Sequence, residues 1–269
     1  MIIKRPSSPL YYGPMVDLNS LHYALGQGYK FAQPDQEIKY GEDWKLAKRI
    51  LKGNEYWTGV FENKEAEMTA DTAFYAVSQG YTLILNRAQS VLPNIYQASW
   101  QLEEALGWLV NTNLYLTASG GAQGFEAHID WMDGFIFQTA GTKRWKSYDP
   151  PYVLYPRPDM TTRPTQEFLT NRNHSDSGFP PVNDFILRSG DLAYIPRGFV
   201  HEACTSSEDI PPNISPNLDD LHPYEMPSLH LTFGIEVGKD YTLEVKTSLF
   251  HSHQTHSPFS ISWPFTLTL

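Results

Sequence analysis

The chain has 269 residues, of which 41% are hydrophobic, 14% aromatic and 19% charged, and this composition excludes a disordered or fibrous protein. Lys and Arg number 20 against 30 Asp and Glu, and the formal charge of -10 argues against a general nucleic-acid-binding protein. One cysteine, Cys204, excludes an internal disulfide framework and favours a reducing compartment.

Helical patterns are concentrated near the start of the chain. Apolar residues three and four apart, in runs that end at glycine, predict amphipathic helices over residues 18–28 and 42–53. A third helix is predicted over residues 98–108, with Ser99 as its N-cap. The apolar run at residues 81–86 predicts a strand between them.

From Asn111 onward the pattern changes to short β runs separated by turn residues. The runs are TNLYLTA, DGFIFQT, KRWKSYD, DFILRS, LAYIP and SLHLTFGIEV. Many short strands without intervening helical patterns predict that residues 111–246 form a barrel or a sandwich. We expect residues 1–110 to pack on this unit and residues 247–269 to form a loosely packed tail, so that the chain is one structural domain.

Targeting signals are absent from the sequence. No apolar run of signal-peptide length opens the chain, and no 18-residue apolar stretch occurs in it. These absences predict a soluble, intracellular protein without membrane contact, and they leave cytoplasmic and nuclear or nucleolar locations open.

A histidine and an aspartate two residues apart interrupt the apolar and aromatic segment GFEAHIDWMDGFIF. His128 and Asp130 lead into a predicted strand, and residues two apart on an extended chain point to the same face. His174 and Asp176 have the same spacing in a polar, proline-flanked segment, so the tripeptide alone is weak evidence for a metal site. Asp133 is interpreted as a turn residue.

The best candidate for a third ligand is His201, which follows the strand-like run LAYI and a bend at Pro196 and Gly198. Two imidazoles and one carboxylate on one face of a metal leave the opposite face open, as suits non-haem Fe(II) that activates O2. Structural zinc usually has four protein ligands with several cysteines among them, and this chain has one cysteine. Catalytic zinc held by two histidines and one carboxylate stays open as an alternative.

Three segments together carry a resemblance to a known family: NLYLTASGGAQGFEAHIDWMDGFIFQTAGTKRWKSYDP, RSGDLAYIPRGFVHEA and SLHLTFGI. They resemble the JmjC-type 2-oxoglutarate oxygenases, and within these the ribosomal oxygenase group of arginyl and histidyl protein hydroxylases. The resemblance covers roughly residues 10–237. It implies a mainly β fold with flanking helices, a double-stranded β-helix (cupin or jelly-roll barrel) of the JmjC type.

The resemblance also implies which residues bind the cofactors. His128, Asp130 and His201 would hold Fe(II), and 2-oxoglutarate would chelate the metal beside O2. Lys143 matches the basic residue that binds the far carboxylate of 2-oxoglutarate, and a solvated turn lysine is the alternative interpretation.

Four further positions are implied to line the same cavity. Asn113 and Tyr115 match an Asn-x-Tyr pair that lines the cosubstrate and substrate pocket in relatives, once one extra residue in ASGGAQGF is allowed for. Gln138 and His230 are expected to face the cavity as well. A hydrogen-bonded core histidine is the equal alternative for His230.

The function implied by the resemblance is an Fe(II)- and 2-oxoglutarate-dependent dioxygenase that hydroxylates a protein side chain, as in ribosomal proteins. A JmjC demethylase acting on histone or other methyl-lysine is the main alternative, and a non-catalytic cupin binding module is a further one. An acidic chain would suit a basic protein or peptide, such as a ribosomal protein or histone, and direct nucleic-acid binding is not expected.

The end of the chain departs from the family pattern. Ribosomal oxygenases commonly continue into a helical dimerisation region and a winged-helix domain, and the last residues here resemble neither. A minimal relative and an incomplete gene product are both compatible with this, so dimerisation stays open.

Overall fold

The structure is a computed structural model that describes residues 2–3, 15–31, 33–53, 55–61, 68–160, 162–165, 168, 183–205 and 226–236. The predicted tail at residues 247–269 and the pair His174 and Asp176 lie outside the described residues. Within these ranges, no helix combines the length and the apolar character needed to cross a membrane.

Helix α1 (Leu18–Gln27) confirms the first predicted helix. The Asp17 side chain accepts a hydrogen bond from the backbone N–H of Ser20, which caps the start of the helix. Gly28 ends the helix at φ 72, a left-handed conformation that glycine adopts without strain.

The predicted helix over residues 42–53 is wrong, because these residues form strand β4 (Trp44–Lys52). Strand β4 lies in a sheet between β5 (Glu55–Val60) and β6 (Thr82–Leu85), with antiparallel hydrogen bonding to both. Its short apolar run fits a helical period locally, but pairing with two neighbouring strands decides the conformation. Strand β6 confirms the strand predicted at residues 81–86.

Helix α3 (Pro93–Leu106) confirms the third predicted helix but begins earlier than expected. Pro93 occupies its first turn, where the missing N–H costs nothing. Ser99 is therefore not an N-cap but a buried residue inside the helix. Its hydroxyl donates to the carbonyl of Ile95 and bonds to the hydroxyl of Thr112 on the adjacent strand.

Helix α2 (Ala70–Ser78) was not predicted from the sequence. It begins after Thr69, whose hydroxyl accepts a hydrogen bond from the backbone N–H of Thr72. Its buried face consists of small residues, so the apolar signal is weak: Ala70, Ala73, Ala76 and Val77.

The strands of the described residues form three antiparallel sheets, in the orders β1-β11-β8-β13-β7-β6-β4-β5, β10-β9-β12 and β2-β3. All six strands predicted from Asn111 onward are confirmed. The remaining elements are β1 (Ile2–Ile3), β2 (Tyr29–Lys30), β3 (Gln33–Glu37), η1 (Ala88–Ser90), β7 (Leu109–Thr117), β8 (Asp133–Ala140), β9 (Thr142–Ser147), β10 (Asn183–Arg188), β11 (Leu192–Ile195), β12 (His201–Cys204) and β13 (Ser228–Glu236).

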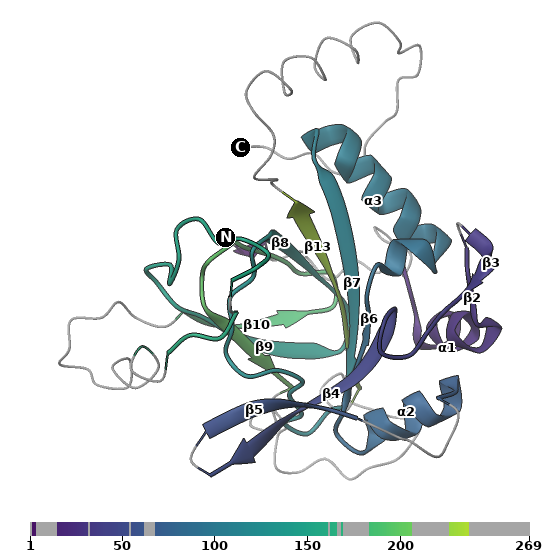
Figure 1. Ribbon diagram of the computed structural model, residues 1–269, viewed down its shortest axis with the longest axis horizontal. Helices are drawn as coiled ribbons and strands as arrows, with labels where there is room; N and C mark the ends of the chain where they lie inside the picture. The colour runs from purple at the N-terminus through teal and green to yellow at the C-terminus, as the bar shows by residue number, and fades with distance from the viewer. Residues whose placement is uncertain are drawn as a thin grey trace, which may run out of the picture.

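The largest sheet has two faces of different chemistry, because side chains alternate along each strand. One face packs against the three α-helices, which Figure 1 shows on the side away from β9 and β10. That face is apolar and fully buried at its centre, with Leu114 of β7 and Leu231 of β13 paired across the strands. The opposite face carries Tyr115 and His230, which are also paired, and it lines a cavity.

Candidate metal centre and cosubstrate cavity

Two histidines lie directly opposite each other on neighbouring extended segments. His201 opens β12, and its backbone N–H donates to the carbonyl of His128 at 2.8 Å, while the N–H of His128 donates back at 3.0 Å. Directly opposed residues of an antiparallel pair project their side chains to the same face. The two imidazole centroids are therefore only 4.5 Å apart.

Asp130 completes a cluster of three possible metal ligands. Its carboxylate oxygens lie 4.0 Å from Nε2 of His128 and 3.5 Å from Nε2 of His201. One ligand atom from each residue lies within 4.8 Å of the other two, so a single ion could contact all three. The backbone carbonyl of Asp130 accepts a hydrogen bond from the N–H of Gly198 at 2.9 Å, which ties Asp130 to the bend before His201.

The orientation of both imidazoles fits a metal. Nδ1 of His128 lies 2.9 Å from the carbonyl oxygen of Glu126, and Nδ1 of His201 lies 3.1 Å from that of Phe199. Because a carbonyl can only accept, each Nδ1 must carry a proton, so Nε2 is the nitrogen of each ring that is left to bind a metal once it is deprotonated. A proton on Nδ1 is what binding of a metal through Nε2 requires.

The charges of the cluster are coupled. Burial alone would raise the pKa of Asp130, but its hydrogen bond with His201 and the positive charges of the two histidines lower that pKa to about 2. Burial and then the neighbouring His201 lower the pKa of His128. Burial also opposes protonation of His201, but Asp130 outweighs it and raises the pKa of His201. Asp130 is therefore an ionised carboxylate, as a metal ligand must be.

Lys143 lies on β9 with its side chain inside the molecule and only 4% of its surface exposed. Its Nζ donates to the hydroxyl of Thr117 at 3.0 Å, and no carboxylate among the described residues acts on its pKa. Burial lowers that pKa to about 7. A buried ammonium without a counter-ion is costly, so its environment favours binding of an anion.

A cavity of about 380 Å³ joins the three-residue cluster to Lys143, a volume typical of small-molecule sites. Two buried nitrogens beside it, Nε1 of Trp145 and Nδ1 of His230, have no hydrogen-bond partner among the described residues. Buried polar groups are normally hydrogen-bonded, so both nitrogens are available to a ligand. Burial and then the charge of Lys143 lower the pKa of His230 well below its usual value, so this imidazole is neutral.

The structure brings Tyr115 and His230 into this cavity, where their rings stack at 4.8 Å. Asn113 lies in a smaller adjoining cavity of about 40 Å³, which Tyr115 and Asp130 also line. The Asn113 side-chain nitrogen is 3.5 Å from the hydroxyl oxygen of Tyr115. Asn113 therefore reaches the main cavity through Tyr115.

Gln138 is not among the residues that line either of these cavities, although its side chain is fully buried. Its amide nitrogen donates to the hydroxyl of Ser228 at 2.9 Å and to the carbonyl of Ala140 at 2.7 Å. These bonds hold the amide between β8 and β13, where the strand register shifts at His230.

Two threonines near Lys143 could not be recognised as site residues from the sequence. Thr82 and Thr117 are directly paired between β6 and β7, and their hydroxyl oxygens are 3.0 Å apart. A Cβ added at Gly124 would lie only 2.8 Å from the hydroxyl oxygen of Thr82, so glycine is required for this close approach. No local pattern marks these threonines, because the register between two strands brings them to Lys143.

Asp133 is the first residue of β8, and its interpretation as a turn residue is wrong. Its carboxylate accepts hydrogen bonds from the backbone N–H of Arg197 at 2.9 Å and from the hydroxyl of Tyr194 at 3.2 Å. It therefore fixes the bend that leads from β11 to His201 and takes no place in the ligand cluster.

A model of the JmjC domain matches residues 89–215, a segment that contains the three-residue cluster and Lys143. This part of the chain is thus similar to the JmjC domain, and the predicted fold class, a mainly β double-stranded β-helix with flanking helices, is confirmed. The solved structure of E. coli ycfD shares the fold, with a TM-score of 0.51 and 15% identity, over 100% of this chain and 58% of that one.

Two curated relatives illustrate the sequence similarity. Ribosomal oxygenase 2 of Rattus norvegicus is 28% identical over 214 residues, which are 77% of this chain and 39% of the relative. The bifunctional lysine-specific demethylase and histidyl-hydroxylase NO66 of Drosophila persimilis is 34% identical over 130 residues, 48% of this chain and 17% of the relative. The chain thus spans less than half the length of these relatives.

Proposed function

We propose that the chain is an Fe(II)- and 2-oxoglutarate-dependent dioxygenase that hydroxylates a protein side chain. The observation that carries this proposal is that one cavity holds both the three-ligand cluster and the buried ammonium of Lys143. Three protein ligands leave coordination positions open for a bidentate ligand and O2. 2-Oxoglutarate has chelating oxygens at one end and a carboxylate for Lys143 at the other.

Each residue then has a definite role. His128, Asp130 and His201 would hold Fe(II), which together with 2-oxoglutarate supplies the oxidising chemistry when bound. Lys143, assisted by Thr117, would bind the far carboxylate and so fix the position of the cosubstrate. Tyr115, on the wall of the same cavity, would contact the bound molecules.

The other residues in and around the cavity would support binding. Neutral His230 and the indole of Trp145 each offer a nitrogen that has no partner among the described residues. Asn113 would orient Tyr115, and Gln138 would hold the register of the strands that carry His230. The barrel at residues 111–246 and the segment 1–110 are proposed to form one domain, since β4, β5 and β6 extend the sheet of β7.

The relatives support a protein as the substrate. Their names specify a ribosomal oxygenase and a histidyl-hydroxylase, and the net charge of -10 suits a basic ribosomal protein or histone peptide. An intracellular location follows from such a substrate. The name of NO66 also specifies a lysine-specific demethylase, so demethylation of methyl-lysine is the second candidate.

The test is turnover by the purified chain with Fe(II), 2-oxoglutarate and O2, against ribosomal proteins and against methylated and unmethylated histone peptides. Hydroxylation predicts succinate together with a stable gain of one oxygen in a product peptide, measured by mass spectrometry. Demethylation predicts formaldehyde and a loss of methyl groups. A non-catalytic binding module predicts no O2-dependent change in any of them.

A matched pair of variants makes the turnover test specific. His128→Ala should abolish succinate formation, because it removes one of the three ligands. His22→Ala is the control, since His22 also contacts an aspartate, Asp71 at 2.7 Å, but on the exposed surface. Equal turnover by both variants would contradict the proposal.

A further inference from the structure

Arg87 has an unusual backbone conformation. It lies between β6 and η1 with φ 50 and ψ 46, and it is the one described residue other than glycine with a positive φ. This left-handed conformation is unfavourable for a residue with a Cβ, so surrounding contacts must hold it. A glycine would adopt it freely, which indicates that the arginine side chain is used.

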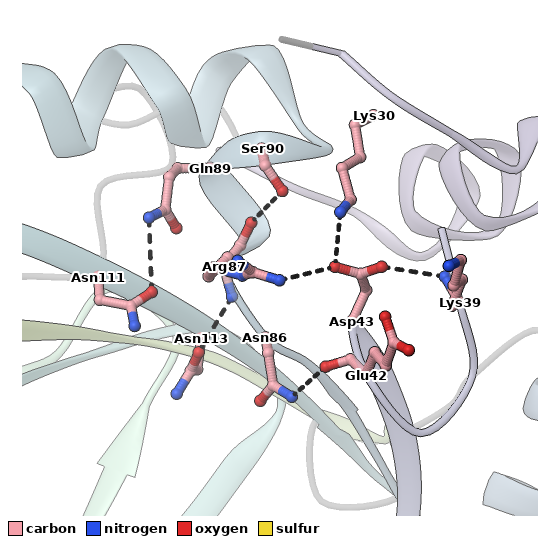
Figure 2. A network of polar contacts seen from close by, with 10 residues as sticks. All are labelled: Lys30, Lys39, Glu42, Asp43, Asn86, Arg87, Gln89, Ser90, Asn111 and Asn113. Carbon is pink, nitrogen blue, oxygen red and sulfur yellow. Dashed lines mark hydrogen bonds and ion pairs between the residues drawn. The ribbon is translucent and has the colours of Figure 1, made fainter. Parts of the chain in front are cut away.

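A buried carboxylate anchors that side chain. Nη2 of Arg87 lies 3.0 Å from Oδ1 of Asp43, which is 1% exposed, and Lys30 binds the same oxygen at 3.0 Å (Figure 2). The second oxygen of Asp43 accepts from the backbone N–H of Lys39 at 3.0 Å. These contacts offset burial and lower the pKa of Asp43, so it is a fixed negative charge.

The backbone of Arg87 in turn orients an amide of the barrel. Its N–H donates to the side-chain oxygen of Asn113 at 3.2 Å, and Figure 2 shows this contact beside the ion pair with Asp43. A backbone N–H can only donate, so the amide oxygen of Asn113 must face Arg87. The amide nitrogen must then face Tyr115, whose hydroxyl oxygen is 3.5 Å away.

The direction of this chain of hydrogen bonds has a consequence for Tyr115. Its oxygen accepts from Asn113, and so its own hydroxyl proton is directed to another partner. Tyr115 lines the main cavity, which Lys143 also lines, and the smaller cavity, which Asp130 also lines. None of the hydrogen bonds among the described residues uses that proton, which leaves it for a bound molecule.

We propose that Asp43 and Arg87 are positioning residues for the cavity: they hold Asn113 so that Tyr115 donates its hydroxyl proton to an oxygen atom of bound 2-oxoglutarate. This inference deepens the proposed function and rests on it for the identity of the ligand. The contact between Arg87 and Asn113 does not depend on the ligand, so the two can be tested separately.

The first test reads the Asn113 side-chain amide signals by NMR in the metal-free protein labelled with ¹⁵N-asparagine. Arg87→Gln should shift or broaden both amide proton signals, because the anchor to Asp43 is lost. Lys30→Gln is the matched control: it removes the other cation from the same Asp43 oxygen and should leave the signals unchanged. Arg87→Lys keeps a cation beside Asp43, so its Asn113 signals should lie closer to those of the native chain than the signals of Arg87→Gln do.

Arg87→Gly keeps the test decisive if Arg87→Gln does not fold, because glycine tolerates the left-handed backbone while removing the anchor. It should also shift or broaden the Asn113 signals. Unchanged signals in the Arg87 variants, or equal changes in the Lys30 variant, would overturn the positioning role. Shifted signals in a protein that never converts 2-oxoglutarate would overturn the proposed function alone.

The second test is a double-mutant cycle on the affinity for 2-oxoglutarate, measured by calorimetry with Co(II) in place of iron. Tyr115→Phe and Arg87→Gln should each weaken binding roughly twofold to tenfold, the effect of one hydrogen bond. If Arg87 acts through Tyr115, the double variant should bind no more weakly than Tyr115→Phe alone. Unchanged affinities, or effects that multiply, would overturn the proposed donation by Tyr115.

Discussion

The two faces of the large sheet use the same strands for different purposes. On β7 and β13, Leu114 and Leu231 face the helices and are fully buried among apolar side chains. On the other face, Tyr115 and His230 line a cavity that contains a buried ammonium and two nitrogens without partners among the described residues. The apolar face supplies stability, and the cavity face gives up stability for binding.

The largest effect is expected on the apolar face. Leu231→Ala should lower the free energy of unfolding by about 2–5 kcal/mol, because it leaves a space in a fully buried cluster. Thr232→Ala, one residue along on the cavity face, should lower it by less than about 1 kcal/mol. Urea denaturation measures the free energy of unfolding of both variants. Equal losses would contradict the proposed difference between the two faces of the sheet.

Lys143 reaches the same cavity from β9 of the three-stranded sheet, and removal of its charge should separate binding from stability. Lys143→Met should weaken 2-oxoglutarate binding roughly tenfold to a hundredfold, since charge-assisted hydrogen bonds contribute about 1.5–3 kcal/mol. The ligand-free variant should be more stable than the native chain, because a buried cation without a counter-ion is removed. Calorimetry and urea denaturation measure the two effects.

Lys146→Met is the control, because Lys146 lies on the same strand but three residues along and outside the cavity lining. It should leave the affinity for 2-oxoglutarate unchanged. If both lysine variants lost affinity equally, a general loss of positive charge would explain the result and the role of Lys143 would be wrong.

The ionisation of Lys143 also predicts a dependence of stability on pH. Its pKa is lowered from 10.5 to about 7 in the folded chain, so between these values the unfolded chain binds more protons than the folded one. Stability of the ligand-free protein should therefore rise with pH across this window, with a contribution of about 1.4 kcal/mol per pH unit. The destabilisation is fully present below pH 7.

Lys143→Met isolates this contribution from other titrating groups. The difference in unfolding free energy between the native chain and the variant should shrink as pH rises from about 7 to about 10.5. A difference that is independent of pH would show that Lys143 has an ordinary pKa and a counter-ion.

The smallest effect is expected at Gly124. Gly124→Ala should cost about 1 kcal/mol of stability, because the new Cβ would force the Thr82 side chain away from Thr117. It should also weaken 2-oxoglutarate binding slightly, since Thr117 bonds to Lys143. Gly26→Ala is the control, because a Cβ added there meets no neighbouring atom. An equal effect of both substitutions would contradict the close packing of Gly124 against Thr82.

Much of the β architecture could be predicted because alternation is visible in short strands. The run LVNTNLYLT places its apolar residues on alternate positions, and that alternation became the two faces of β7. The segment 42–53 could not be assigned correctly. The spacing of its apolar residues fits a helix, but pairing with β5 and β6 makes it a strand. Local pattern carries no information about that pairing.

The candidate site also contains residues that the local sequence pattern could predict and residues that it could not. His128, Asp130 and His201 could be proposed together because two of them share an extended segment and the third follows a distinctive bend. Thr82 and Trp145 could not, since only strand register and side-chain packing bring them to the cavity. The anchor of Arg87 on Asp43 joins distant segments and leaves no motif.

The most direct test of the central claim is a Co(II) titration of the purified chain, followed by visible absorption. The native chain and His22→Ala should bind one ion each with equal affinity, whereas His128→Ala should bind roughly a hundredfold more weakly or not at all. Equal Co(II) binding by His128→Ala and the native chain would contradict the claim that His128, Asp130 and His201 form a metal centre in the cavity.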